Sequence, residues 1–253
     1  MSDFKSAFEK LFFIMCELRE KCPWDQKQTM ESLRHLTIEE CYELSDAIIK
    51  KQHDSVKEEL GDILLHVLFY SIIANEKKHF SITDVINSQS EKLIHRHPHI
   101  YGDVKASTEA DVKRNWELLK LQEKKKESIL SGVPNSLPSM LKSYRIQEKV
   151  KNVGFNFSKK SDAFEKIIEE IKECVDEISS GNLEKASDEF GDVLFALIGY
   201  GQMLGINSVN ALEKTNKKFI TRFNKMETII KQENKKLKDY SIAELNLLWS
   251  RVK

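Results

Sequence analysis

The chain has 253 residues, with 40 Lys and Arg, 40 Asp and Glu, and a formal net charge of zero. This length suits one or two domains with hydrophobic cores, and the balanced charge argues against a general nucleic-acid binder or a polybasic membrane-surface protein. Only nine glycines and four prolines interrupt a sequence rich in Lys, Glu, Leu and Ile. Long regular elements are therefore expected, and the composition predicts an all-α fold.

In the first half, amphipathic patterns predict helices over 2–21, 36–51, 54–76, 81–95 and 107–127. Helix-start signals agree with this, since Ser81 with Asp84 and Thr108 with Asp111 have capping-box spacing, and Asp54 precedes an apolar run.

No membrane span, signal peptide or disulfide framework is expected. The longest nearly apolar stretch, 63–74, is shorter than a membrane span requires, and the acidic N-terminus has no small-residue cleavage site. The four cysteines form no CxxC pair, which favours reduced thiols and a cytoplasmic protein.

A turn-rich stretch divides the chain. Residues 128–138, ending in GVPNSLP, follow a charged run and predict a linker between an N-terminal domain, 1–127, and a C-terminal domain, 139–253. The second half predicts helices over 138–152, 161–180, 182–204, 207–233 and 241–252, the last opened by Ser241 with Glu244 at capping-box spacing.

The two halves repeat each other. When residues 39–75 are shifted by 130 positions, ten of them are identical to residues 169–205, whereas chance would give about two or three. The matches are concentrated on acids, with Gly61 and Gly191 inside ELGD and EFGD. A glycine in mid-helix costs about 1 kcal/mol relative to Ala, so its recurrence suggests close packing or the approach of a ligand.

The repeated acids predict a metal site in each half. Each half has two acids three residues apart on one helix and two more on the next, so each pair shares a helix face. In an antiparallel hairpin that turns at residue 51, or at Gly181 in the second half, the two pairs lie level. The predicted ligands are Glu40, Glu43, Glu59 and Asp62 in the first half, and Glu170, Glu173, Glu189 and Asp192 in the second.

Such clusters call for cations. Two carboxylates about 5 Å apart repel by roughly 3 kcal/mol at an effective dielectric constant near 20, so either cations bind or some acids stay protonated. Oxygen ligands without His or Cys favour Mg²⁺ or Mn²⁺ over Zn²⁺, and Mg²⁺ sites suit phosphate substrates. On a helical wheel Glu40 and Glu43 fall within an apolar stripe, whereas Glu170 and Glu173 fall at the polar margin.

These motifs resemble those of a known family. EECYE with EELGD, and EEIKE with DEFGD, are similar to the ExxE–ExxD signature of the all-α nucleoside triphosphate pyrophosphohydrolases. CPWDQKQT, HRHPHIYGD, SILSGVPNSLPSM, VGFNF, NKKFITRF and the final WSRVK resemble segments of the MazG family in its tandem two-domain form. One departure is Asn156, where that family more often has Asp.

The resemblance implies Mg²⁺-dependent hydrolysis of NTPs or dNTPs to NMP and pyrophosphate, with broad base tolerance, in nucleotide-pool housecleaning or a stress response. It also implies a homodimer, and the balanced charge predicts neither nucleic acid nor membrane as a partner. The nucleotide-contacting residues would be Lys218, Arg222, Trp249 and Lys253, and the first half has Lys92, Arg96, Trp116 and Lys120 in matching order. Cationic side chains neutralise phosphate oxygens, and Trp offers a face on which any base stacks.

Glu169 and Glu39, each one residue before a ligand pair, are candidates for the general base. In the family, activity is usually credited to the second copy of the domain. In this sequence the first copy also has all four acids of the motif. The sequence leaves open whether water attacks the α or the β phosphorus.

Two other classes of helical protein make different predictions for this sequence. A di-iron carboxylate bundle needs two Glu-x-x-His motifs, and only Glu76 with His79 fits. A non-enzymatic helical interaction module would show no effect of Mg²⁺ on its melting temperature. Among the weaker signals, His95, His97 and His99 suggest Zn²⁺ without a second ligand set, and His53-Asp54 resembles HD-type phosphohydrolases without their other ligands.

Overall fold

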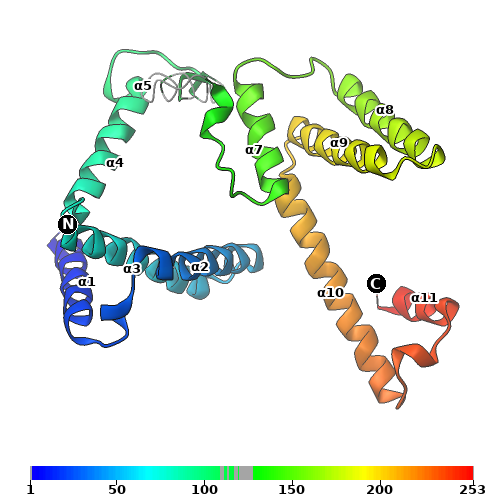
Figure 1. The fold of residues 1–253 in the computed structure, drawn as a ribbon, viewed down its shortest axis with the longest axis horizontal. Helices are drawn as coiled ribbons and strands as arrows, with labels where there is room; N and C mark the ends of the chain where they lie inside the picture. Colours follow the sequence, from blue (N-terminus) through cyan, green and yellow to red (C-terminus); the bar gives the residue numbers. More distant parts are fainter. Residues whose placement is uncertain (1, 109–110, 113, 117–118, 120–127, 253) are drawn as a thin grey trace. The chain divides into compact units, whose positions relative to one another are not determined.

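The structure, a computed structural model, describes residues 2–108, 111, 112, 114–116, 119 and 128–252. Contacts between Cα atoms divide the chain into two units, Met1–Val104 and Lys105–Lys253 (Figure 1). The sequence instead predicts a first domain that ends at residue 127, which lies outside the described residues. In the structure a short 3-10 helix within the expected linker contacts the first long helix of the second unit. The expected linker over 128–138 stays a prediction.

The first unit is helical throughout its described elements. They are α1 (Ser2–Lys21), the 3-10 helix η1 (Asp25–Lys27), α2 (Met30–Lys50), α3 (His53–Glu76), α4 (Ile82–Arg96) and α5 (Pro98–Tyr101). Helices α2 and α3 lie side by side as an antiparallel hairpin (Figure 1). Its turn contains Lys51, whose backbone is left-handed with φ of 57°, at the residue where the register of the acids places the turn.

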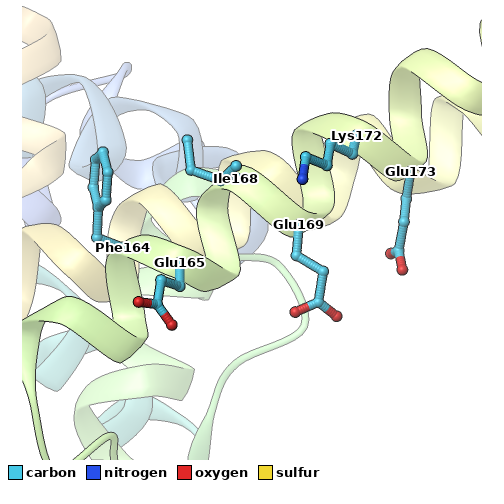
Figure 2. A pocket seen from close by; sticks show the side chains of 6 residues that line it. All are labelled: Phe164, Glu165, Ile168, Glu169, Lys172 and Glu173. Carbon is cyan, nitrogen blue, oxygen red and sulfur yellow. The ribbon is translucent and has the colours of Figure 1, made fainter.

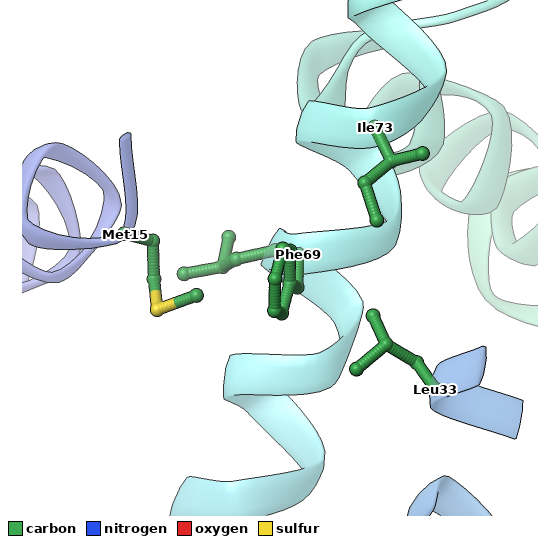
Figure 3. Close-up of a cluster of buried hydrophobic side chains, with 5 residues drawn as sticks. Met15, Leu33, Phe69 and Ile73 are labelled. Carbon is green, nitrogen blue, oxygen red and sulfur yellow. The ribbon is translucent and has the colours of Figure 1, made fainter. Parts of the chain in front are cut away.

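The core of the first unit lies between α1, α2 and α3. Met15, Leu33, Leu68, Phe69 and Ile73 form a buried cluster, and Figure 3 shows Phe69 with Met15 on one side and Leu33 on the other. The Arg19 guanidinium, half of an ion pair with Glu76, lies over the Phe69 ring at 5.8 Å from its centroid. This packing fixes α3, and with it the acids on its first turns, against the rest of the unit.

The second unit repeats the hairpin. Its described elements are η2 (Ile129–Gly132), α7 (Ser139–Asn152), α8 (Lys160–Ser179), α9 (Leu183–Met203), α10 (Ser208–Gln232), η3 (Leu237–Asp239) and α11 (Ile242–Arg251). Helices α8 and α9 pair along their lengths (Figure 1). Gly181 forms the turn with φ of 80°, and the Asn182 side chain caps α9. A separate cluster of Met226, Ile230, Leu248 and Val252 holds α11 against α10.

The predicted all-α fold and its two tandem helical halves are confirmed. Capping boxes form at Ser81, Thr108 and Ser241 as expected. The predicted start of the second helix at residue 36 is wrong, because Thr29 and Ser32 form a capping box that starts α2 at Met30. In this capping box Ser32 is the third residue after the N-cap, where the other boxes have an Asp or a Glu. None of the helices described is both long and apolar enough to cross a membrane.

Candidate functional site

The α2–α3 hairpin gathers the acids of the first half. Glu40 and Glu43 lie on one face of α2, Glu59 lies across from them on α3, and one carboxylate oxygen of each is within 4.8 Å of the other two. Asp62, one turn further along α3, is close enough to Glu40 and Glu59 to act on both electrostatically. The register of the hairpin therefore brings three of the four predicted acids into one group, with Asp62 one turn away.

The electrostatics show what this arrangement costs without a cation. The pKa of Glu40 is raised, first by burial and then by the negative charges of Asp62 and Glu43. The pKa of Glu59 is raised for the same reasons, burial first and then Glu43 and Glu40. Like charges in a partly desolvated place disfavour ionisation, so Glu40 and Glu59 hold their protons more tightly than isolated carboxylates do.

The α8–α9 hairpin builds the matching cluster. Glu170, Glu173 and Glu189 each offer an oxygen within 4.8 Å of the others. The pKa of Glu189 is raised by burial and by the charges of Glu173 and Asp192. Asp192 is exposed and lies beside the group of three, as Asp62 does in the first half.

The expectation that Glu170 lies at the polar margin is wrong, because its side chain is only 8% exposed. The buried face of α8 runs through Ala163, Ile167, Glu170 and Cys174. Their spacing of four, three and four residues is the helical core pattern, and this pattern was the sequence signal that could have found the burial.

Lys166 is a residue of this site that sequence reasoning missed. Its ammonium Nζ lies 2.7 Å from a carboxylate oxygen of Glu169 and 2.7 Å from one of Glu170. Hydrogen bonds to these two acids raise the pKa of Lys166 well above its ordinary value, so the side chain stays cationic. The i,i+3 and i,i+4 spacing of a lysine and two glutamates was the available signal.

A hollow of about 640 Å³ lies along the outer side of α8 and is lined in part by acids of the site. Figure 2 shows Glu165, Glu169 and Glu173 following one another along the helix, with Phe164 and Ile168 forming the apolar part of the lining. Glu173 thus belongs both to the carboxylate cluster and to an open surface. The second cluster therefore has one carboxylate, Glu170, buried in the hairpin and another, Glu173, accessible from outside.

The structure does not place the candidate general bases within the groups of three. Glu39 and Glu169 are both exposed, and Glu169 is paired with Lys166. Their catalytic role stays a prediction.

The basic and aromatic residues carried over from the family lie on other helices. In the second unit Lys218 is exposed and Arg222 half-buried on α10, whereas Trp249 on α11 packs against the buried cluster, with its ring 4.9 Å from that of Phe219. Lys253 lies outside the described residues.

In the first half the corresponding residues differ in exposure. Lys92 is half-buried and Arg96 is 7% exposed, both on α4, and Trp116 is half-buried. Lys120 lies outside the described residues. For all eight residues a contact with nucleotide stays a prediction.

The two mid-helix glycines are not packing positions within the described chain. A Cβ atom built on Gly61 or Gly191 would meet no other described atom within 4 Å. The expectation of close packing there is wrong for the described chain, whereas the approach of a ligand stays a prediction.

Histidines contribute no metal cluster of three ligands among the described residues. The His97 and His99 rings lie 5.6 Å apart, and His97 Nδ1 lies 2.6 Å from the carbonyl oxygen of Leu93. His66, one turn after Asp62, is buried, and its Nδ1 finds no hydrogen-bond partner in the described part of the chain. Burial lowers the pKa of His66, against the opposing effect of Asp62.

Comparison with known proteins also finds the repeat. The family model described as "MazG nucleotide pyrophosphohydrolase domain" matches residues 28–101 and again 159–227, which spans both hairpins. The chain belongs to the MazG family. In this MazG-family protein each copy of the domain carries one of the two carboxylate clusters.

Two relatives match the chain over nearly its whole length. The MazG-family chain is 42% identical over 250 residues to "Nucleoside triphosphate pyrophosphohydrolase/pyrophosphatase MazG" of Thermotoga maritima, covering 97% of this chain and 95% of the relative. It is 34% identical over 256 residues to "Nucleoside triphosphate pyrophosphohydrolase" of Escherichia coli K12, covering 98% of this chain and 97% of that protein. The tandem form recognised in the sequence is thereby shown.

Proposed function

We propose that this MazG-family protein hydrolyses nucleoside triphosphates to nucleoside monophosphate and pyrophosphate. Water adds to phosphorus, the anhydride bond between the α and β phosphates breaks, and the proton of the water is released. The observation that carries the proposal is the pair of carboxylate clusters, with oxygens within 4.8 Å, in a chain that belongs to this family. The names of its full-length relatives support the same reaction.

Mg²⁺, with Mn²⁺ as a substitute, is the cofactor that the donor set favours. Three carboxylates close together supply only hard oxygen ligands, which fit Mg²⁺ or Mn²⁺ and give no preference to Zn²⁺. Glu170, Glu173 and Glu189 would hold the ion in the second copy, with Asp192 beside them. A bound Mg²⁺ would polarise the phosphate chain and lower the pKa of water.

The chain's own cationic and aromatic groups would bind the substrate. Lys218 and Arg222 lie one turn apart on α10, so both are placed to neutralise the same polyphosphate. The half-buried Trp249 ring lies 4.9 Å from that of Phe219, and a base stacking on its exposed part would be tolerated whatever its identity. Broad base specificity follows from such a contact.

The test of the reaction is pyrophosphate release from a panel of NTPs and dNTPs with Mg²⁺. Wild type is compared with Glu43→Gln, which disables the first cluster, and Glu173→Gln, which disables the second. Glu165→Gln is the control, because Glu165 is an exposed acid of α8 outside the cluster. We expect the loss in Glu173→Gln, since activity in this family is usually credited to the second copy. Equal activity in wild type and both cluster variants would contradict the proposal.

The biological role that fits a base-tolerant enzyme is maintenance of nucleotide pools, either by clearing noncanonical nucleotides or by lowering pools under stress. We place this role in the cytoplasm, which the four free thiols support. Comparing kcat/KM for canonical and noncanonical triphosphates tests the first role. Equal values for all of them would favour the second.

A homodimer is the proposed assembly. The α8–α9 hairpin exposes several large apolar side chains, among them Val175 at 53%, Ile178 at 54% and Phe190 at 57%. Exposed apolar surface of this kind marks a protein interface more often than a free surface. Light scattering coupled to size-exclusion chromatography tests this, and a monomer at micromolar concentration would contradict it.

A further inference from the structure

The second carboxylate cluster contains a cation of its own. Lys166 lies one turn before Glu170 on α8, and its ammonium is 2.7 Å from carboxylate oxygens of both Glu169 and Glu170. The Lys166 side chain is 37% exposed, whereas that of Glu170 is 8% exposed. A buried carboxylate needs a compensating partner, and this ammonium supplies it in the absence of any ion.

The first cluster has no equivalent. The shift of 130 positions that superimposes the acids places Leu36 where the second half has Lys166, and Leu36 packs against the hydrophobic core of the first unit. Within the described part of that unit, none of the ion pairs formed by Lys or Arg involves Glu40, Glu43 or Glu59. The repeat has therefore kept the acids and changed the residue one turn before them.

We propose that Lys166 is a resident counter-cation that competes with divalent metal for Glu170, so that the second cluster binds metal more weakly than the first. This inference rests on the proposed metal sites. An incoming ion must either displace the ammonium, losing a charge-assisted hydrogen bond, or share the carboxylates with it and suffer like-charge repulsion. Both routes lower the affinity of the second cluster, whereas the first cluster has no ammonium that an ion must displace.

The experiment measures Mn²⁺ binding to the full-length chain by isothermal titration calorimetry. The two clusters are separated with single-site backgrounds, since Glu43→Gln leaves only the second cluster and Glu173→Gln leaves only the first. In the Glu43→Gln background, Lys166→Leu introduces the residue of the first half. We expect it to tighten the Kd of the second cluster about tenfold, which corresponds to 1.4 kcal/mol.

Reciprocal and control variants test whether the charge at residue 166 causes the change in Kd. Leu36→Lys in the Glu173→Gln background should weaken the first cluster, and Lys166→Arg should leave the Kd of the second cluster within about twofold because it keeps the charge. Lys172→Leu removes an exposed lysine from the same helix and should also change that Kd by less than about twofold. Should Lys166→Leu disturb packing, Lys166→Met keeps the length of the stem and removes only the charge.

A second readout needs no metal. The melting temperature of the metal-free protein should fall in Lys166→Leu, because Glu170 then stays buried without a cation, and Mn²⁺ should raise it by more than in wild type. An unchanged Kd in both Lys166→Leu and Lys166→Met, with both proteins folded, would overturn this inference and leave the metal sites standing. Failure of Mn²⁺ to bind in either background would instead overturn the proposed function.

Discussion

Replacing Arg19 by Met should destabilise the first unit more than any other single change to a surface charge there. The guanidinium donates to both carboxylate oxygens of Glu76, at 2.8 and 2.9 Å, and to the backbone carbonyls of Gln28, at 3.0 Å, and Asp25. These contacts join α1 to the segment before α2 and to the end of α3. Methionine keeps an apolar stem of similar length and removes all four.

The size of the effect follows from the exposure of each partner. The Arg19 side chain is 15% exposed, but Glu76 is 44% exposed, so the ion pair contributes no more than about 1 kcal/mol. Two hydrogen bonds from a charged donor to backbone carbonyls add about 1 kcal/mol each. Losing the contact between Arg19 and the Phe69 ring adds about 0.5 kcal/mol. The total loss in the free energy of unfolding is therefore about 2–4 kcal/mol.

The dependence of this loss on pH identifies the ion pair. The hydrogen bond from Arg19 lowers the pKa of Glu76 below its ordinary value of 4.5. A lowered pKa in the folded state contributes stability above the unfolded pKa, and this contribution disappears as the pH falls through the folded value. The loss caused by Arg19→Met should thus be larger at pH 7 than at pH 3.

The assay is urea unfolding combined with hydrogen exchange of peptides from α1 and α3, since the chain has two units that need not unfold together. Lys21→Met is the matched control, because this lysine is on the same helix and forms an i,i+4 pair with Glu17 at 65% exposure. Its effect should stay within about 0.5 kcal/mol. A loss below about 0.5 kcal/mol for Arg19→Met, or one that does not change with pH, would refute the reasoning.

Three further predictions concern packing, backbone and charge. Phe69→Ala should cost about 3–5 kcal/mol in urea unfolding, because the ring is 1% exposed, whereas Phe13→Ala, at 67% exposure, should cost under about 1 kcal/mol; similar losses would contradict the assigned core. Lys51→Gly should raise the melting temperature, because glycine tolerates the left-handed backbone of that turn, and the gain in the free energy of unfolding should be up to about 1 kcal/mol. Gly181→Ala at the equivalent turn should lower the melting temperature. The opposite signs would refute this. Glu40→Gln should stabilise the metal-free protein at pH 7, because a raised pKa means that the ionised form disfavours folding. The gain should fall as the pH drops and vanish well below the ordinary pKa of 4.5, where the carboxyl is protonated in both states; a gain independent of pH would count against the cluster.

The hairpins could be predicted from the sequence because their determinants are local. Apolar residues at helical spacing define the helices, and the equal spacing of acids on either side of residues 51 and 181 fixes the turns and the register together. The start of α2 was placed six residues too late for a local reason as well. Ser32 serves as the third residue of a capping box in which an acid was expected.

The surroundings of the acids were less predictable because they depend on which face of each helix is covered. Glu170 continues the stripe of Ile167 and Cys174, so pairing of α8 with α9 buries it, although its residue type favoured the surface. The cationic partner of Glu170 comes from the same helix, because Lys166 lies one turn away and reaches its carboxylate. Helical periodicity shows that Lys166 is within reach of Glu170. Only the packing of the helices shows that Glu170 is buried and that its charge therefore needs a cationic partner.

The sequence alone does not distinguish a packing role from a nucleotide-stacking role for Trp249. The family motif assigns this residue to the nucleotide, and the structure places its ring against Phe219 beside the buried cluster that joins α11 to α10. The contact with Phe219 restrains the orientation of the Trp249 ring, and a restrained ring loses less entropy when a base stacks on it. A rigid core contact and a tolerant stacking contact are thus compatible in one side chain, and the residue type alone could not separate them because both uses require the same flat apolar surface.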